Sequence, residues 1–323
     1  MQVFDHFDDN AAPKIVVLGT GGTIAGLATA SGDNLDYQAA QLGVAQLMDG
    51  LPRTEGLVVV TEQVAQIDSK DMDVVIWRDL ALRCAHWLAD ESVQGIVVTH
   101  GTDTLEETAY FLQAALAPAK PVVMACAMRP ANALMPDGPQ NLRDAVTVAA
   151  TPDARGVLAV CAGVVHGALD VRKLHAYRLD AFGSGDAGPV GYVEEGVLRR
   201  VRAWPATPSR CAPPAQWPAE ADGWPRVEIV TSHAGAGGAM VESLVRDGVQ
   251  GLVVAGTGNG SLHGKLEAAL LRAQAAGVRV LRSSRCDQGQ VMGKPGDSLP
   301  HAGALSPVKA RIRLMLELLG WRP

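Results

Sequence analysis

The chain alternates between short, unbroken apolar runs and longer amphipathic stretches, and this pattern constrains its fold more than any other feature. In the first half, apolar runs at residues 14–18, 57–61, 95–99 and 121–125 alternate with stretches of helical spacing at residues 73–89, 104–117 and 139–149. A strand covered on both faces of a sheet is apolar throughout, which suits a parallel sheet. The pattern therefore predicts an α/β fold with a larger N-terminal domain, in which helices flank a mostly parallel sheet.

Six prolines interrupt this periodicity between residues 197 and 225, and three tryptophans, Trp204, Trp217 and Trp224, lie among them. We interpret residues 197–225 as a Pro-rich linker that follows an N-terminal domain of residues 1–196. The alternation then resumes, with strands expected at residues 226–231, 251–255 and 278–283 and helices at residues 240–247, 266–276 and 307–319. Residues 226–323 are therefore predicted to form a smaller C-terminal α/β domain.

Composition excludes several classes of protein. A chain of 323 residues with 48% hydrophobic residues is long enough for about two domains and too apolar to be mainly disordered. Lys and Arg total 28 against 34 Asp and Glu, a net charge of −6, and no basic run is present. We therefore expect no nucleic acid partner. The apolar stretches are too short to cross a bilayer, so no membrane association is expected either.

The N-terminus and the cysteines predict a cytoplasmic location. The first ten residues carry Asp5, Asp8 and Asp9 where a secretory signal would begin with positive charge. The five cysteines are scattered, odd in number and form no C-x-x-C pair. This usage favours reduced thiols and suggests neither a disulfide framework nor a zinc site.

Two polar turns follow predicted strands, at the sheet edge where α/β proteins bind ligands. Residues 19–26 read Gly-Thr-Gly-Gly-Thr-Ile-Ala-Gly, and residues 99–107 read Thr-His-Gly-Thr-Asp-Thr-Leu-Glu-Glu. The first turn lacks the final glycine of a dinucleotide fingerprint, and the chain has no P-loop. Taken alone, this turn could also be purely structural, with threonines that bond only to backbone. In the second turn, Thr104 and Glu107 have the spacing of a capping box, which predicts a helix N-terminus.

Together, the two turns can supply what hydroxyl catalysis needs. A hydroxyl is a weak nucleophile that requires a base and an oxyanion site. Backbone N–H groups at residues 21–22 and 101–102 can face a developing oxyanion, and Asp103 offers a carboxylate. His100 is a candidate base, although its place at a strand end favours a structural role. The chain contains neither a G-x-S-x-G elbow nor an H-E-x-x-H motif.

These motifs resemble those of the bacterial-type L-asparaginases and glutaminase-asparaginases. Residues 20–26 are similar to the first signature of that family, and residues 99–109 to the second. Similarity continues through residues 68–72, 121–130, 137–139, 256–261 and 282–285, so the resemblance covers nearly the whole chain. It implies hydrolysis of a side-chain amide through an acyl-threonine intermediate, without metal or organic cofactor, in a homotetramer built from close dimers.

By motif position, the resemblance implies catalytic roles for Thr23 as nucleophile and for Tyr37, in a mobile lid, as its activator. Thr102, Asp103 and Lys173 would form a second relay of hydroxyl, carboxylate and amine. The resemblance also implies that Ser69 binds the substrate carboxylate and that Asp103 binds the ammonium group. The alternative for Ser69 is a helix N-cap, a role that it could fulfil at the same time. The Ala127 carbonyl would accept from the leaving amide, and Gly22 completes the expected binding residues.

Two departures from the family pattern weaken the expected recognition of a substrate ammonium group. Lys70 stands where many relatives carry glutamine, and residues 285–301 contain no counterpart of the glutamate that relatives lend to a neighbouring subunit. The main hypothesis is hydrolysis of L-asparagine to L-aspartate and ammonia, with some glutaminase activity possible. The alternatives are an amino-acid or amide sensor without turnover, an amidase for substrates lacking the α-ammonium group, and the amidase subunit of a tRNA-dependent amidotransferase.

Overall fold

The structure is a computed structural model that describes residues 13–30, 32–51, 56–205 and 216–322. The described residues up to Ser184, together with residues 188–205, form one compact unit. Residues 185–187 and those from 216 onward form a second. The predicted fold class is confirmed. A large, mostly parallel sheet flanked by helices forms the first unit, and a small parallel sheet with helices forms the second.

The first unit is built on a mixed sheet whose strand order, within the described residues, is β12-β11-β8-β7-β6-β5-β1-β4. The neighbours β4, β1, β5, β6 and β7 run parallel, and β8, β11 and β12 are added antiparallel at the other end. The strands are β1 (Lys14–Gly21), β4 (Val58–Ile67), β5 (Val93–Thr99), β6 (Pro121–Ala125), β7 (Gly156–Cys161), β8 (Val164–Gly167), β11 (Gly191–Glu194) and β12 (Val197–Arg200).

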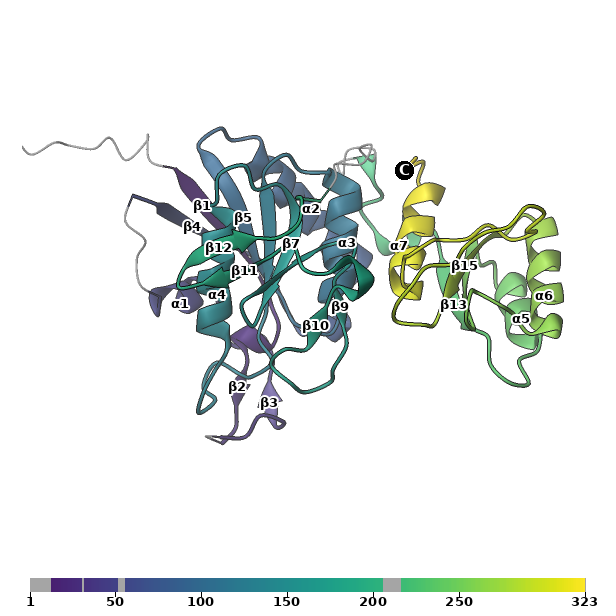
Figure 1. Ribbon diagram of the computed structural model, residues 1–323, viewed down its shortest axis with the longest axis horizontal. Helices are drawn as coiled ribbons and strands as arrows, with labels where there is room; N and C mark the ends of the chain where they lie inside the picture. The colour runs from purple at the N-terminus through teal and green to yellow at the C-terminus, as the bar shows by residue number, and fades with distance from the viewer. Residues whose placement is uncertain (1–12, 31, 52–55, 206–215, 323) are drawn as a thin grey trace, which may run out of the picture. The chain divides into compact units, whose positions relative to one another are not determined.

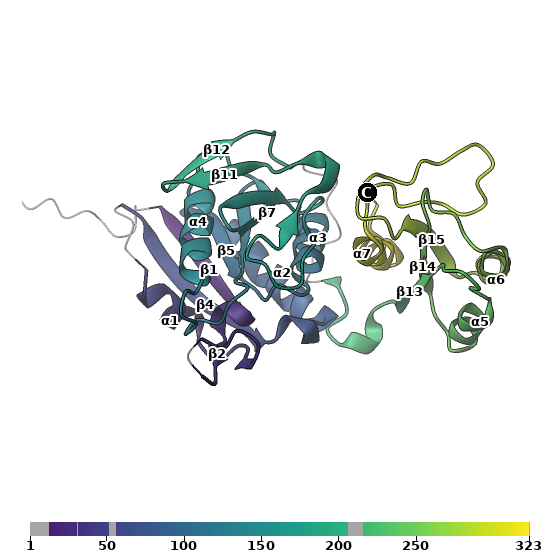
Figure 2. The same cartoon turned by 60° about the horizontal axis from the view of Figure 1, so that its bottom comes forward.

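Helices cover both faces of this sheet (Figures 1 and 2). Helix α4 (Gly138–Ala149) lies on one face, where its apolar residues join the inward side chains of the central strands in one core. Helices α2 (Val74–Leu88) and α3 (Leu105–Leu116) lie on the other face. The central strands are buried throughout, which explains why they read as unbroken apolar runs. The short helix α1 (Val44–Asp49) packs beside β4 and β1.

Small elements extend from the carboxyl end of the sheet. A 3-10 turn, η1 (Thr23–Ala25), follows β1 and leads into a hairpin of β2 (Leu27–Ala28) and β3 (Tyr37–Gln38). A second 3-10 turn, η2 (Ser69–Asp71), follows β4. The pair β9 (Arg172–Lys173) and β10 (Phe182–Gly183) lies outside the main sheet.

The predicted linker includes one strand of the main sheet. We expected the linker to begin at residue 197, but residues 197–200 form β12, which pairs with β11, while Leu198 packs against the core. Trp204 is buried in that same core. Trp217 and Trp224 are also buried, in edge-to-face contact with ring centroids 5.5 Å apart. Residues 206–215 lie outside the described residues, so the linker is irregular over less of its length than its prolines predicted.

The second unit contains a parallel three-stranded sheet of β13 (Val227–Thr231), β14 (Gly251–Gly256) and β15 (Arg279–Ser284), in that order. Helices α5 (Ala239–Arg246) and α6 (Gly264–Ala275) contact each other. Helix α7 (Pro307–Leu318) packs against all three strands. Pro307 occupies the first turn of α7, as predicted, because the missing N–H of proline is not needed there.

Candidate active site

Four neighbouring parallel strands deliver predicted site residues to one edge of the sheet. Thr23 follows β1, Ser69 follows β4, Thr102 follows β5, and Ala127 follows β6. These strands are adjacent in the order β6-β5-β1-β4. Since the carboxyl ends of parallel strands meet at one edge, the topology gathers these residues there, as expected for a ligand site in an α/β protein.

The two threonine turns touch each other through glycine. Gly22, the residue before Thr23, has a φ of +82°, and a Cβ placed on it would overlap the backbone of Gly101, the residue before Thr102. A positive φ is accessible to glycine at little cost, and only a residue without a Cβ permits this approach. The two glycines therefore bring the Thr23 and Thr102 turns into backbone contact.

The hydroxyl groups in the first turn have different partners. Thr20 Oγ1 donates to the Thr99 carbonyl at 2.8 Å and so ties β1 to β5. Thr23 Oγ1 instead lies 2.8 Å from Tyr37 Oη, which β3 brings back from the hairpin. The turn is thus not a purely structural one in which every threonine bonds only to backbone. Thr20 therefore bonds to backbone, whereas Thr23 contacts the hydroxyl of a tyrosine side chain.

The second turn holds a hydroxyl, a carboxylate and an amine in contact. Lys173 Nζ donates to Thr102 Oγ1 at 2.8 Å and to Asp103 Oδ1 at 2.6 Å. The Lys173 side chain is mostly buried, at 18% exposure, whereas that of Asp103 is 56% exposed. Lys173 comes from β9, some 70 residues further along the chain. One ammonium group therefore bridges the alcohol and the carboxylate, and one side of Asp103 remains open to solvent.

Ser69 is held against the second turn by bonds that replace local caps, although the helix N-terminus predicted at Thr104 is confirmed. Ser69 Oγ accepts from the Asp103 amide at 3.2 Å, and its carbonyl accepts from Thr104 Oγ1 at 2.7 Å. Thr104 does precede α3, but its hydroxyl makes this tertiary bond instead of capping the helix. Ser69 is not an N-cap either, because Asp68 caps η2 and Asp73 caps α2. In both cases a contact distant in sequence replaces the local bond.

Lys70 is paired with an adjacent acid. Its side chain is 64% exposed, and Nζ lies 2.7 Å from Asp68 Oδ2 and 4.0 Å from Asp71 Oδ2. The hydrogen bond that Lys70 Nζ donates to Asp68, and the negative charge of Asp68, raise the pKa of Lys70, and the charge of Asp103 adds to this. Lys70 is therefore charged, within the electrostatic range of Asp103, and compensated locally by Asp68. This ion pair was not predicted from the sequence, although a lysine two residues after an aspartate could have indicated it.

His100 is part of the core and is not placed to act as a base at the site. It is fully buried; Nδ1 donates to the Gly101 carbonyl at 2.7 Å, and Nε2 lies 2.9 Å from Thr108 Oγ1. Trp77 Nε1 donates in turn to Thr108 Oγ1. Burial lowers the pKa of His100 to about 4, so the ring is neutral at pH 7. Both ring nitrogens have hydrogen-bond partners, and the chain of contacts through Thr108 and Trp77 links the second turn to α3 and α2.

One of the expected oxyanion donors is already in use. The Gly22 amide donates to the Ile67 carbonyl at 2.8 Å, which corrects the expectation that it faces a substrate. This bond forms because the register of β1 against β4 shifts at Gly21, where the strand turns toward Ile67. Among the described residues, the amides of Gly101 and Thr102 donate to no protein acceptor. Ala127 is fully buried beyond β6.

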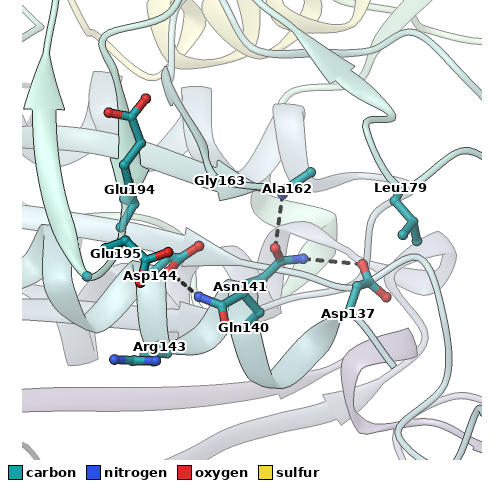
Figure 3. Close-up of a pocket in the computed structure, with 12 residues that line it drawn as sticks. Asp137, Gln140, Asn141, Arg143, Asp144, Ala162, Gly163, Leu179, Glu194 and Glu195 are labelled. Carbon is teal, nitrogen blue, oxygen red and sulfur yellow. Dashed lines mark hydrogen bonds between the residues drawn. The ribbon is translucent and has the colours of Figure 1, made fainter. Parts of the chain in front are cut away.

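A separate surface pocket of about 540 Å³ lies beside α4, and its lining includes none of the predicted catalytic residues. Figure 3 shows Asn141 at its base, donating to Asp137 and accepting from the Ala162 amide. Asp144 also lines the pocket and accepts from Gln140; burial raises the pKa of its carboxyl group. Among the described residues, no cluster of three or more His, Cys, Asp or Glu side chains is arranged to hold a metal ion.

Comparison with known proteins identifies the family. The model of the asparaginase N-terminal domain matches residues 14–204, and that of the glutaminase/asparaginase C-terminal domain matches residues 226–320. The chain belongs to the L-asparaginase and glutaminase-asparaginase family. The resemblance inferred from the two threonine motifs is thereby confirmed.

Relatives of this asparaginase-family chain match along nearly all of it. "L-asparaginase 2" of Bacillus subtilis is 37% identical and covers 95% of this chain and 82% of the relative. "Glutaminase-asparaginase" of Pseudomonas fluorescens is also 37% identical, over 94% and 86%. The crystal structure of a "Probable Cytoplasmic L-asparaginase" from Campylobacter jejuni has a TM-score of 0.85 at 36% identity and covers 95% of both chains. A relative from Haemophilus influenzae is named "Probable L-asparaginase periplasmic".

No helix among the described residues of this family member combines the length and apolar character needed to span a membrane.

Proposed function

We propose that this chain hydrolyses the side-chain amide of L-asparagine to L-aspartate and ammonia, with Thr23 as nucleophile. The observation that carries the proposal is the 2.8 Å contact between Thr23 Oγ1 and Tyr37 Oη, in a turn whose backbone touches Gly101, the residue before Thr102. A hydroxyl needs an adjacent group to activate it, and the Tyr37 side chain lies within hydrogen-bonding distance. The names of the relatives include both asparaginases and glutaminase-asparaginases, which supports the same reaction class.

The reaction proceeds in two steps, acylation of Thr23 and hydrolysis of the resulting ester. Thr23 Oγ1 attacks the amide carbon, an ester forms, and the amide nitrogen leaves as ammonia with the proton released from the hydroxyl. Water then attacks the ester carbon, which regenerates the Thr23 hydroxyl and releases the carboxylate. The Gly101 and Thr102 amides donate to the oxyanion in each step, because they have no acceptor within the described protein.

Thr102, Lys173 and Asp103 form the second relay of this mechanism. Asp103 orients the Lys173 amine, and the amine exchanges a proton with the Thr102 hydroxyl, as the contacts of 2.6 and 2.8 Å allow. The location of Thr102 near the start of α3 adds the partial positive charge of the helix N-terminus, which favours developing negative charge.

Substrate recognition is assigned to the groups around Ser69. Its Oγ accepts from the Asp103 amide, so the hydroxyl proton is available to donate to the α-carboxylate of the substrate. The exposed side of Asp103 accepts from the α-ammonium group. Ala127 offers its carbonyl to the leaving amide. Lys70 does not strongly oppose binding of the substrate ammonium group, since Asp68 balances the charge of Lys70. We therefore propose asparagine as the substrate and not an amide that lacks the α-ammonium group.

Measuring ammonia released by the purified protein tests this function. Asparagine, glutamine and the monoamide of succinic acid, which lacks the α-ammonium group, are compared at equal concentration. We expect release from asparagine above the other two, and its loss in Thr23→Ala. Folded protein that binds asparagine in calorimetry without releasing ammonia would establish the sensor alternative. Release from the succinic monoamide alone would establish the amidase alternative.

The assembly and the location are proposals as well. We expect a homotetramer of close dimers in the cytoplasm, where the described free cysteines Cys84, Cys126, Cys161 and Cys286 stay reduced. Light scattering of the protein as it elutes from a size-exclusion column tests the tetramer, and a monomeric mass would contradict it. Cell fractionation tests the location.

A further inference from the structure

A side chain that none of the motifs includes holds the base of the hairpin carrying Tyr37. Asn132 Oδ1 accepts from the Ala28 amide at 2.7 Å, and Asn132 Nδ2 donates to the Ala28 carbonyl at 3.0 Å. Ala28 thus uses both of its backbone groups on one amide side chain that is 104 residues away. A primary amide can do this because it carries a donor and an acceptor side by side.

The loop that presents Asn132 is fixed at its base. The Asp137 carboxylate accepts from the Met128 amide at 2.9 Å and from the Arg129 amide at 3.0 Å. Asn141 on α4 donates both to that carboxylate and to the Cys126 carbonyl. Figure 3 shows this Asp137–Asn141 pair at the start of α4. The loop is therefore tied at both ends to a helix that packs on the main sheet.

A second bond from the same loop reaches the chain beside Ala28. The Ala131 amide donates to the Gly26 carbonyl at 2.8 Å. Gly26 in turn packs closely under Tyr37, because a Cβ placed on Gly26 would lie 3.0 Å from Tyr37 Cδ2. Two consecutive loop residues, Ala131 and Asn132, therefore hydrogen-bond to the backbone of residues 26–28, the segment that packs against the tyrosine ring.

The contact between Asn132 and Ala28 continues to the nucleophile. Ala28 on β2 is the register partner of Tyr37 on β3, and Tyr37 Oη reaches Thr23 Oγ1. The other side of the hairpin is anchored independently, since the Ala40 amide donates to the Gly22 carbonyl at 3.1 Å. Because β2 and β3 have only two residues each, their pairing alone gives little rigidity. The position of the Tyr37 hydroxyl depends on these flanking anchors.

We infer that Asn132 is a positioning residue for the hydrolysis: by clamping the backbone of Ala28 it fixes the β2–β3 hairpin so that Tyr37 meets Thr23. This inference rests on the proposed function in so far as Tyr37 activates Thr23. Asn132 itself lies at the surface and touches neither of these hydroxyls in the structure. The effect of Asn132 is transmitted through Ala28. Asn132 therefore positions a catalytic group and does not bind the substrate.

The test compares Asn132→Ala with a matched control, Leu134→Ala, in the same loop. Leu134 is 79% exposed, so its removal perturbs the surface of the loop without touching the clamp. A misplaced catalytic group costs rate more than affinity. We therefore expect Asn132→Ala to lower kcat for asparagine about tenfold with KM changed less than about threefold, and Leu134→Ala to leave both unchanged. Asn132→Asp keeps the acceptor for the Ala28 amide and should fall between the wild type and Asn132→Ala.

A double-mutant cycle separates positioning from general damage. If Asn132 acts through Tyr37, then Asn132→Ala in a Tyr37→Phe background should lower kcat by less than about twofold, because the group being positioned is already gone. Equal losses of kcat in both backgrounds, or wild-type kcat in Asn132→Ala, would overturn the inference while leaving the proposed function intact.

Amide hydrogen exchange gives a readout that does not depend on turnover. Exchange at Ala28 should rise at least about tenfold in Asn132→Ala and stay unchanged in Leu134→Ala, since the Ala28 amide loses its acceptor only in the first variant. If the wild type released no ammonia, the proposed function would fall, and exchange would still decide whether Asn132 fixes the hairpin. Unchanged exchange at Ala28 would refute the clamp itself.

Discussion

Gly22 and Gly101 meet backbone to backbone at the point where the two threonine turns converge, and neither has room for a side chain. A Cβ on Gly22 would overlap the Gly101 backbone, while a Cβ on Gly101 would overlap Ser69 Oγ. The Thr23, Thr102 and Ser69 turns are therefore packed around two glycines. The geometry of the candidate site depends on this close approach.

Gly22→Ala is expected to damage both stability and activity. The methyl group would meet backbone atoms that cannot rotate away, so the two turns must separate, at a cost of about 2–4 kcal/mol in the free energy of unfolding. Gly248→Ala is the matched control, because Gly248 has a similar φ of +78° but open space around it. It should cost only the conformational strain, about 1 kcal/mol. Urea unfolding measures both, and equal losses in the two variants would contradict the packing argument.

Removing the Thr23 hydroxyl should abolish most turnover. We expect Thr23→Ala to lower kcat at least ~10²-fold, since catalytic groups that act as a unit fail together. Thr20→Val, three residues earlier, removes a hydroxyl that donates to the Thr99 carbonyl. That variant should lose about 1 kcal/mol of stability and keep its kcat within a few-fold. Activity within a few-fold of wild type in Thr23→Ala would move the nucleophile elsewhere, with Thr102 the next candidate.

The Asp68–Lys70 pair leads to a prediction about substrate affinity. Asp68→Asn removes the nearest acidic partner of Lys70 and leaves its charge less compensated near Asp103, so KM for asparagine should rise about threefold at low salt and less at high salt. Lys70→Gln alone should change KM by less than about twofold, because exposed ion pairs contribute little. Combining the two substitutions should restore the KM of Lys70→Gln. A KM that stays high in the double variant would attribute the effect to the lost Asp68 cap of η2.

Much of the fold could be predicted because its elements have strong periodic signals. Strands such as β1 and β5 are buried on both faces, and α7 carries one apolar stripe, so the sequence patterns reflect burial directly. β12 gave no such signal, since its four residues pair at the end of the sheet and carry two arginines. The expected linker consequently began too early, since Trp204 also belongs to the core of the first unit.

The candidate site was predictable only in part. The turns after β1 and β5 stand out because polar residues follow buried strands there, but no periodicity predicts where Lys173 or Tyr37 lies, and both were placed by family resemblance. Contacts between distant turns were not predictable in the same way. Thr104 has the sequence of a cap, yet its hydroxyl bonds to the Ser69 carbonyl, a partner that only the assembled sheet brings near. The Asn132 clamp on Ala28 spans 104 residues and carries no local signal.

The buried His100 predicts a loss of stability in mild acid. Burial lowers its pKa to about 4, against about 6.5 in the unfolded chain, so between these values the unfolded chain binds more protons. Stability should therefore fall as the pH drops from about 6.5 to 4, with a contribution on the order of 3 kcal/mol at the low end. Urea unfolding of His100→Gln across this range should show a weaker dependence on pH than the wild type, although the variant starts less stable because its contacts with Gly101 and Thr108 are disturbed. A wild-type slope in His100→Gln would show that the pH dependence arises from other groups.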